Sequence, residues 1–378
     1  MSTLALATIC GGAAPITPAT VSLVRVPAGG IQPEVEVRDG VLHVLYFSGE
    51  AEHGDLNYVR SLDYGRTFSA PMRVNSTPGS AIAVGAIRGA QLAIGRNGRA
   101  HVAWNGSNLA QPRGPGDQAP MLYARLNDAG AAFEPERNLI SSAWGLNGGG
   151  TLAADAQGDV YVFWHAPLVG KAANEENRRV WMAKSSDDGK TFARERVPFD
   201  SPTGVCGCCG MHAFVGADGA VQVLFREAFQ TVHRDMYLLT SHDRGGTFQG
   251  TDISRWNIGA CVMSSEAFAQ TKDETLAAWE TEKQVYFGEV KAGTVPRPIG
   301  APGTGENRKY PALATNSRGE TLLAWTEGTA WKKAGSLAWQ VYDGDLKLQG
   351  STGKSDGVPV WSFPATFARP DSTFVVIY

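Results

Sequence analysis

An eight-residue pattern, S-x-D-x-G-x-T-F, constrains the fold of this chain more than any other feature of its sequence. It occupies residues 61–68, 185–192 and 241–248, and a degenerate copy occupies residues 126–133. In each copy the Asp carboxylate can accept hydrogen bonds from the backbone N–H groups of a tight turn, and the Gly permits a left-handed backbone angle. The Phe is expected to anchor the turn in the apolar layer beneath it. Copies at wide, fairly regular separation predict a repeat architecture.

The rest of the chain has the pattern of short β-hairpins. Several of them contain a D-G or N-G pair between two apolar runs, which is a strong signal for a hairpin turn. The second strands of seven such hairpins are expected at residues 41–46, 100–104, 160–164, 221–225, 276–279, 322–325 and 374–378. An outer hairpin follows each of the first six, at residues 57–74, 121–139, 179–197, 235–253, 284–298 and 336–350. The pattern predicts an all-β propeller with seven four-stranded blades, with six blades as the alternative. Residues 20–26 are expected to complete the seventh blade, so that the N- and C-terminal strands close the ring.

The octets resemble the Asp boxes of sialidases and related BNR-repeat proteins, which are β-propellers. The resemblance implies that each box is a turn between the third and fourth strands of a blade, on the face away from the active site. Asp63, Asp128, Asp187 and Asp243 are therefore expected to be structural. It also implies a secreted protein that binds glycans or hydrolyses them as an exo-glycosidase of the sialidase type. Sialidases have six blades, so a seven-bladed ring departs from the family.

Composition and charge argue against some classes of binding partner. The chain has 378 residues with 45 Gly and 20 Pro, which suits many strands joined by tight turns. Its net charge is −3 and it has no basic block, which argues against nucleic-acid binding. No segment reaches the ~18 apolar residues that a membrane span needs. We expect a monomer that binds a small molecule or a glycan at the rim of the central channel.

Residues 1–19 have the apolar run of an export signal but lack its basic start. They predict a secreted or periplasmic protein, and a disordered tail is the alternative. Cys10 lies in this segment, outside the expected fold. Residues 20–378 are expected to form a single propeller domain.

Polar residues gather where the inner strands begin and the second strands end, which in a propeller is one rim of the channel. The sialidase resemblance implies three arginines that hold a substrate carboxylate, and guanidinium groups match carboxylates well. Arg88, Arg226 and Arg308 lie at suitable strand ends. The family's nucleophile is a Tyr paired with a Glu, a role that Tyr310 can fill with Glu280 or Glu266. No Asp stands out as the acid. His165 is a further rim residue, expected to point over the channel mouth.

The most unusual stretch is the C-G-C-C sequence formed by Cys206, Cys208 and Cys209. Cys261 comes one blade later, and both segments precede an inner strand, so four sulfurs are expected close together. These segments resemble a Cys-rich sub-family of sialidase-like secreted proteins. Two disulfides are one interpretation, since exported proteins often carry them. A site for copper or zinc, with Met263, His212 or His165 adding ligands, is another, and the mixture of thiolate and thioether favours copper. A redox-active thiol pair is the third.

Three functions remain open at this point. The first is glycan binding or hydrolysis, which depends on the resemblance and the rim arginines. The second is a soft-metal or redox propeller that uses the cysteines. The third is a binding scaffold without chemistry, because one fold hosts many functions.

Overall fold

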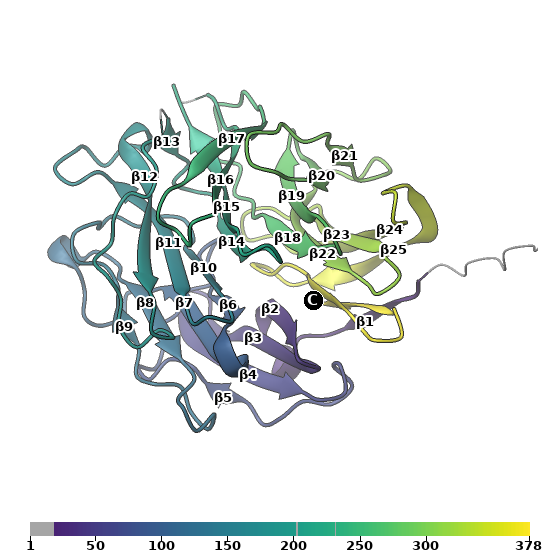
Figure 1. Ribbon diagram of the computed structural model, residues 1–378, viewed down its shortest axis with the longest axis horizontal. Coiled ribbons are helices and arrows are strands. Elements are labelled where there is room, and N and C mark those ends of the chain that lie inside the picture. The colour runs from purple at the N-terminus through teal and green to yellow at the C-terminus, as the bar shows by residue number, and fades with distance from the viewer. Residues whose placement is uncertain (1–18, 202, 231) are drawn as a thin grey trace, which may run out of the picture.

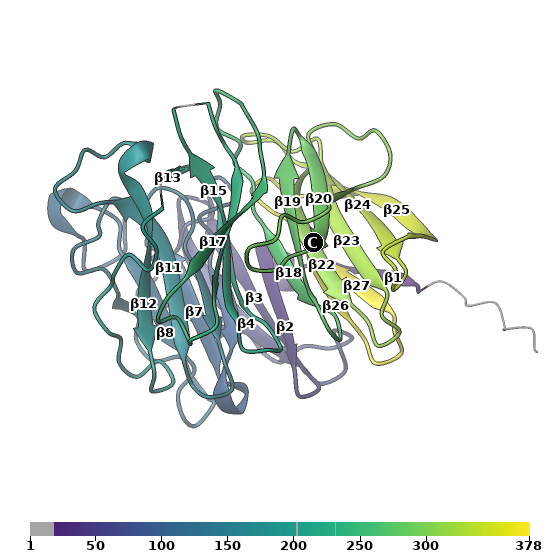
Figure 2. The same ribbon diagram turned by 45° about the horizontal axis from the view of Figure 1, so that its top comes forward.

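A computed structural model describes residues 19–378 except residues 202 and 231. Seven sheets are arranged around a central axis, and Figures 1 and 2 show this ring of blades. The described part contains no α-helix, only four short 3₁₀ helices: η1 (Pro27–Gly29), η2 (Arg96–Gly98), η3 (Pro115–Asp117) and η4 (Glu175–Asn177). No helix among the described residues is long and apolar enough to cross a membrane. The seven-bladed prediction is confirmed, and six blades are excluded.

Each blade begins at the channel with an antiparallel pair of strands and runs outward from it. The inner strands are β2 (Ile31–Arg38), β6 (Gln91–Ile94), β10 (Thr151–Ala154), β14 (Met211–Val215), β18 (Ala267–Gln270), β22 (Lys309–Thr315) and β26 (Ala365–Ala368). The second strands are β3 (Val41–Glu50), β7 (Ala100–Asn105), β11 (Val160–Pro167), β15 (Val221–Ala228), β19 (Thr275–Thr281), β23 (Thr321–Glu327) and β27 (Phe374–Ile377). Inner strands of neighbouring blades contact one another around the whole ring.

The outer half of each blade is less uniform. The third strands are β4 (His53–Ser61), β8 (Met121–Arg125), β12 (Arg178–Ser185), β16 (Met236–Ser241), β20 (Gln284–Glu289) and β24 (Gly335–Tyr342). The outer strands are β5 (Met72–Arg73), β9 (Arg137–Asn138), β17 (Gln249–Ser254), β21 (Ile299–Gly300) and β25 (Leu348–Val358). In the third blade the outer strand is reduced to one isolated bridge between Met182 and Arg196. A short extra strand, β13 (Gly204–Val205), pairs with the far end of β15.

The two ends of the described chain close the ring, as predicted. The strand β1 (Val21–Val24) pairs with β27 in parallel, with Val21 opposite Phe374 and Val24 opposite Ile377. The seventh blade therefore has three strands in the order β26-β27-β1. Pairing the edge of β27 protects its backbone groups from intermolecular pairing. The predicted export signal and Cys10 lie outside the described residues, so secretion stays a prediction.

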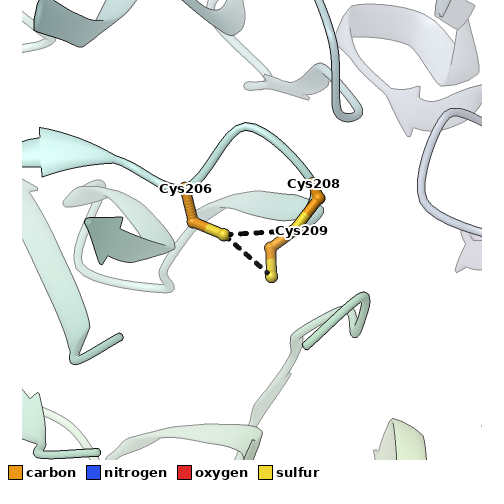
Figure 3. A group of neighbouring side chains, drawn as sticks. All are labelled: Cys206, Cys208 and Cys209. Carbon is orange, nitrogen blue, oxygen red and sulfur yellow. Dashed lines mark hydrogen bonds between the residues drawn. The ribbon is translucent and has the colours of Figure 1, made fainter. Parts of the chain in front are cut away.

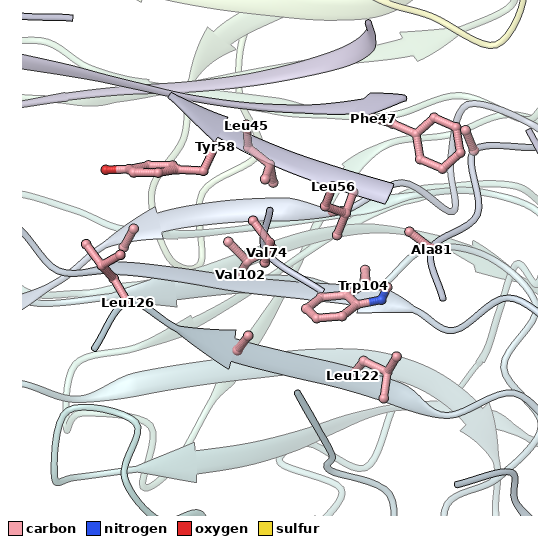
Figure 4. Close-up of a cluster of buried hydrophobic side chains, with 14 of the residues drawn as sticks. Leu45, Phe47, Leu56, Tyr58, Val74, Ala81, Val102, Trp104, Leu122 and Leu126 are labelled. Atoms are coloured by element: carbon pink, nitrogen blue, oxygen red, sulfur yellow. The ribbon is translucent and has the colours of Figure 1, made fainter. Parts of the chain in front are cut away.

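The core is distributed between the blades. Seven apolar clusters fill the seven gaps between neighbouring blades, and Figure 4 shows the one between the first and second. Side chains alternate across a strand, so one strand supplies two clusters. In β11, Trp164 packs toward the second blade, whereas Phe163 packs toward the fourth. This explains why the second strands are apolar throughout.

The three good octets adopt one turn. In the first, Thr67 N–H and Thr67 Oγ1 both donate to Asp63, at 2.8 and 2.7 Å, and Gly65 N–H donates to Ser61 Oγ at 2.8 Å. Equivalent bonds hold Asp187 and Asp243. The degenerate copy differs because it has no hydroxyl residues at these positions. Asp128 instead accepts a hydrogen bond from Arg99 Nη2 at 2.7 Å.

Candidate functional site

Three of the predicted cysteines converge in a tight loop between β13 and β14. Cys206 N–H continues the pairing of β13 by donating to Arg226 O at 2.9 Å, and the chain then turns through Gly207 and Cys208. Gly210 N–H donates to Ser264 O at 3.0 Å, which fixes the other end of the loop to the fifth blade. The loop therefore has a defined shape before any ligand is added.

The sulfur atoms of Cys206, Cys208 and Cys209 lie within 4.8 Å of one another (Figure 3). Cys206 Sγ is 3.4 Å from Cys208 Sγ and 3.5 Å from Cys209 Sγ. The three residues are 1%, 8% and 1% exposed, so Cys208 is the most accessible. They pack with Trp256 and Val262, and Met263 lies against this apolar cluster. The arrangement is a buried group of three soft donor atoms.

No disulfide joins the cysteines of the described part of the chain. Cys261 is exposed and is not a member of the sulfur group, so the structure brings together three of the four predicted sulfurs. It lies six residues before β18, whereas Cys209 lies two residues before β14. The longer connection in the fifth blade places Cys261 away from the loop.

Each of the three cysteines interacts electrostatically with one arginine: Arg178 with Cys206, Arg88 with Cys208, and Arg226 with Cys209. The guanidinium of Arg178 lies against the cysteine loop, since a Cβ added to Gly207 would be 3.2 Å from Arg178 Nε. Burial lowers the pKa of Arg88 and of Arg178. Cys208 opposes the shift of Arg88, whereas Glu175 and, less strongly, Cys206 oppose that of Arg178.

These arginines are held mainly by neutral groups. Arg226 Nη1 and Nη2 donate to the carbonyls of Arg234 and Glu280, at 2.7 and 2.5 Å. Arg88 donates to the carbonyl and side chain of Asn147 and to the carbonyl of Val84. Arg178 donates to Gly145 O at 2.6 Å. Among the described residues no carboxylate lies within salt-bridge distance of any of the three, although Glu175 interacts with Arg178, and Glu266 and Glu280 interact with Arg226, at longer range. Their positive charge favours an anionic cysteine cluster.

The cysteines differ in acidity. The pKa of Cys209 is lowered because the thiols of Cys206 and Cys208 hydrogen-bond to its sulfur and because Arg226 lies nearby. The pKa of Cys208 is raised by its hydrogen bonds to the other two sulfurs and by burial. Thiolate is the form of cysteine that attacks electrophiles and binds metals. Cys209 is thus the first of the three to lose its proton.

A segment of the third blade crosses onto the cysteine loop. Glu175, in η4, accepts a hydrogen bond from Gly207 N–H on Oε1 at 3.1 Å and another from Arg234 Nη2 on Oε2 at 2.7 Å. The backbone of Glu175 also packs closely on β13, since a Cβ added to Gly204 would lie 2.0 Å from Glu175 O. We call residues 168–177 the strap, because they join blade three to the cysteine loop of blade four.

Replacing Glu175 by Gln is expected to loosen the strap and make the buried thiols react about tenfold faster with an aromatic disulfide reagent. The loss of one charge-assisted hydrogen-bond pair is worth about 1.5–3 kcal/mol, enough for such a change. The exposed neighbour Glu176 provides the matched control, Glu176→Gln, which should react like the wild type. Exposed Cys261 serves as an internal reference. Equal slow-phase rates in both variants would show that the strap does not cover the thiols.

The two predicted histidine ligands do not join the sulfur group. His165 is fully buried: its Nε2 accepts from Gly148 N–H at 3.1 Å, and its Nδ1 lies 3.3 Å from Arg178 Nη1. Burial and the charge of Arg178 lower the pKa of His165 to about 3, so it is neutral and supports the loop. The ring of His212 packs against Phe268, with ring centroids 5.9 Å apart. Its pKa is lowered to about 4 by burial.

The predicted catalytic arginines are dispersed. Arg308 is 2% exposed and bonds to Glu327, Gln284 and the carbonyls of Ala301 and Pro302. None of these partners is shared with Arg88 or Arg226. The N–H groups of Arg308 are therefore hydrogen-bonded within the fifth and sixth blades. The Nη groups of Arg226 are hydrogen-bonded within the fourth and fifth.

Tyr310 and Glu280, the predicted nucleophile pair, lie close enough to interact electrostatically. Tyr310 is 8% exposed, and burial together with the charge of Glu280 raises its pKa. Glu280 is 1% exposed, and burial raises its pKa to about 7. Glu266 lies in the same polar group: it interacts with Cys209, Arg226 and Glu280, and burial raises its pKa well above its usual value.

Strained backbone conformations gather at the rim of the ring where the inner strands begin. Five non-glycine residues at the entry to inner strands have left-handed backbone angles: Gln32 (φ 54°), Ala86 (φ 58°), Met263 (φ 52°), Tyr310 (φ 51°) and Trp361 (φ 66°). Such conformations cost of order 1–3 kcal/mol and gather at functional sites. Repetition in five blades makes this rim the best candidate for a binding face.

Sequence reasoning missed Arg178 and Glu175. Candidates were sought at the starts of inner strands and the ends of second strands, whereas Arg178 begins a third strand and Glu175 lies in the loop before it. The signal available in the sequence was the polar insertion before β12, next to the blade that carries the cysteines.

No protein-family model matches the chain, and no curated protein matches it significantly. Solved structures do resemble it. A protein of unknown function from Dyadobacter fermentans aligns over 85% of this chain and 95% of its own, with 13% identity and a TM-score of 0.54. The Hadza microbial sialidase Hz136 aligns over 85% and 70%, with 13% identity and a TM-score of 0.53. An α-L-arabinanase from Penicillium chrysogenum aligns over 86% and 96%, with 14% identity and a TM-score of 0.54. At this identity the likeness establishes a sialidase-like propeller fold.

Proposed function

We propose that this propeller binds one soft metal ion, copper(I), through the sulfurs of Cys206, Cys208 and Cys209. The observation that carries the proposal is the buried group of three sulfurs within 4.8 Å of one another. Thiolate ligands select soft ions such as copper(I).

The ligand number favours copper(I) over zinc. Structural zinc sites are almost always four-coordinate, and zinc sites with three protein ligands keep a fourth position open to water, which three sulfurs at most 8% exposed do not suit. Cys261 is exposed, His165 has both ring nitrogens in contact with other groups, and His212 packs on Phe268. No further His, Cys or carboxylate of the described chain joins the three sulfurs. The thioether of Met263, beside the same apolar cluster, is a further soft donor of the kind that copper(I) binds.

Charge supports the same conclusion. Three thiolates with one monovalent cation form an anionic complex, which is costly to bury without compensation. Arg88, Arg178 and Arg226 supply positive charge around the cluster, one for each cysteine. A single disulfide would leave one cysteine unpaired.

Anaerobic titration of the metal-free protein against a copper(I) chelator tests the proposal. We expect about one copper(I) per chain, withdrawn from the chelator, and copper–sulfur scattering in the X-ray absorption spectrum. Zinc should compete poorly. Copper that stays on the chelator, or copper uptake unchanged after the cysteines have been alkylated, would refute the assignment.

A second candidate function is glycan binding or sialidase-type hydrolysis at the rim. The specific observation in its favour is the interaction of Tyr310 with Glu280, whose Oε2 has no hydrogen-bond partner. This function would need a carboxylate clamp other than Arg226 and Arg308, because both are engaged internally. It predicts turnover on a panel of sialosides that falls at least 100-fold in Tyr310→Phe, a loss within the range of nucleophile removal. Binding without turnover would indicate a non-catalytic scaffold, and neither binding nor turnover would end this candidate.

A further inference from the structure

A metal ion has to pass other side chains to reach the cysteine cluster, because even its most accessible member, Cys208, is only 8% exposed. On one side the strap covers the loop at Gly207. Among the described residues, two partly buried side chains, Ile258 and Met263, pack against the apolar cluster that contains the cysteines. Ile258 carries no donor atom, whereas Met263 carries a thioether. Met263 therefore joins the buried sulfurs to the surface through a soft donor.

The backbone around Met263 is held in a strained conformation. Met263 has a φ of 52°, in the left-handed region that non-glycine residues rarely adopt. Lys309 Nζ donates to the carbonyls of Val262 and Met263. Ser264 O accepts a hydrogen bond from Gly210 N–H at 3.0 Å, which ties the same turn to the cysteine loop. Strain of this kind persists where the surrounding contacts impose it, and it gathers at functional sites. The neighbouring blades thus fix where the Met263 side chain lies.

The end of the Met263 side chain lies between the cysteine loop and an exposed tryptophan. A Cβ added to Gly85 would lie 3.3 Å from Met263 Cε and 3.6 Å from Trp331 Cζ3. The same point is 2.9 Å from Arg88 Nη1, and Arg88 interacts electrostatically with Cys208. Trp331 is 54% exposed. Met263 is therefore near solvent at one end of a short path and near the most accessible cysteine at the other.

We propose that Met263 is the entry residue of the copper(I) site: its thioether takes the ion at the surface and passes it to the cysteine sulfurs. This inference rests on the copper(I) function proposed above. Thioethers and thiolates both select copper(I), and a neutral thioether attracts the cation less strongly than an anionic thiolate does. The ion stays copper(I) throughout. Its bond to a donor from solution is exchanged for a bond to Met263 Sδ, and that bond for one to a cysteine sulfur, which releases any proton it still carries to solvent.

Anaerobic stopped-flow transfer of copper(I) from its bicinchoninate complex tests this role. Met263→Leu keeps the volume of the side chain, a change that cores tolerate well, but removes the donor atom. We expect loading to slow at least about tenfold, which corresponds to about 1.4 kcal/mol at the barrier. Release to an excess of a stronger chelator should slow as well, because a residue on the path acts in both directions. The matched control is Met72→Leu, a partly buried methionine in the first blade's outer strand, which should behave like the wild type.

Three results of this experiment would count against the entry role. Loading of Met263→Leu at the wild-type rate overturns it. Faster release from Met263→Leu also overturns it, since a permanent ligand and not an entry residue would behave in that way. If the wild-type protein takes no copper(I) from the chelator at all, the copper(I) function itself is refuted, and the entry role with it.

A second measurement leaves Met263 in place and so does not depend on the folding of Met263→Leu. Removing Cys208 and Cys209 together by substitution with Ser takes away the two neighbouring thiolates and leaves the thioether as a soft donor on the path. Crystals of this double variant, soaked under nitrogen in excess copper(I) stabilised by acetonitrile, should show anomalous copper signal at Met263 Sδ. Absence of copper from Met263 in these crystals would contradict the proposal.

Discussion

Replacing Cys208 and Cys209 together by Ser is expected to reduce bound copper(I) from about one ion per chain to almost none. The double variant keeps a single thiolate, Cys206, and the serine hydroxyl is a hard donor that soft metals do not select. Both side chains are buried and of similar size to serine, so the fold should persist. Elemental analysis after expression in copper-supplemented medium measures the change.

Cys261→Ser is the matched control, because Cys261 is exposed and outside the sulfur group. It should carry as much copper as the wild-type protein. If Cys261→Ser lost the metal as completely as the double variant, the three-sulfur assignment would be wrong and a four-cysteine site would replace it. If the double variant kept its copper, the site would lie elsewhere in the molecule.

Trp164→Ala should destabilise the propeller by about 3–5 kcal/mol, the usual cost of removing a large buried aromatic side chain. Trp164 is 0% exposed, fills the gap between the second and third blades, and its Nε1 donates to Ala143 O at 3.3 Å. Chemical denaturation followed by tryptophan fluorescence measures the loss.

The control for this effect is Trp331→Ala, since Trp331 is 54% exposed. Surface substitutions usually change stability by no more than about 0.5 kcal/mol. Equal losses in the two variants would contradict a core divided among the gaps between blades.

The architecture could be predicted because its signals are local. Each good octet contains the hydroxyls, the carboxylate and the glycine that its own turn requires, and Asp63, Asp187 and Asp243 make the expected bonds. Ring closure followed from counting strands: the seventh hairpin had no outer pair, one strand was left over at the other end of the fold, and β1 does pair with β27. Local chemistry and an edge that must be covered were enough to favour seven blades over six, and the structure has seven. The assignment of these turns to the BNR-repeat family stays a prediction.

The site was harder to predict, because it depends on how loops of different blades meet. The sequence places Cys206, Cys208 and Cys209 together by their spacing alone. It does not reveal that the connection before β18 moves Cys261 away, nor that the strap brings Glu175 onto Gly207. The arginines were assigned to a substrate carboxylate through the sialidase resemblance. The structure places Arg88 and Arg226 beside the cysteines and Arg308 beside Glu327.

Metal content and free-thiol count, measured on the same sample purified without air or reducing agent, distinguish a copper(I) site from a disulfide. We predict about one copper(I) per chain, with Cys206, Cys208 and Cys209 protected from thiol reagents until a chelator removes the metal. Metal-free protein in which these sulfurs are oxidised to disulfides would contradict it.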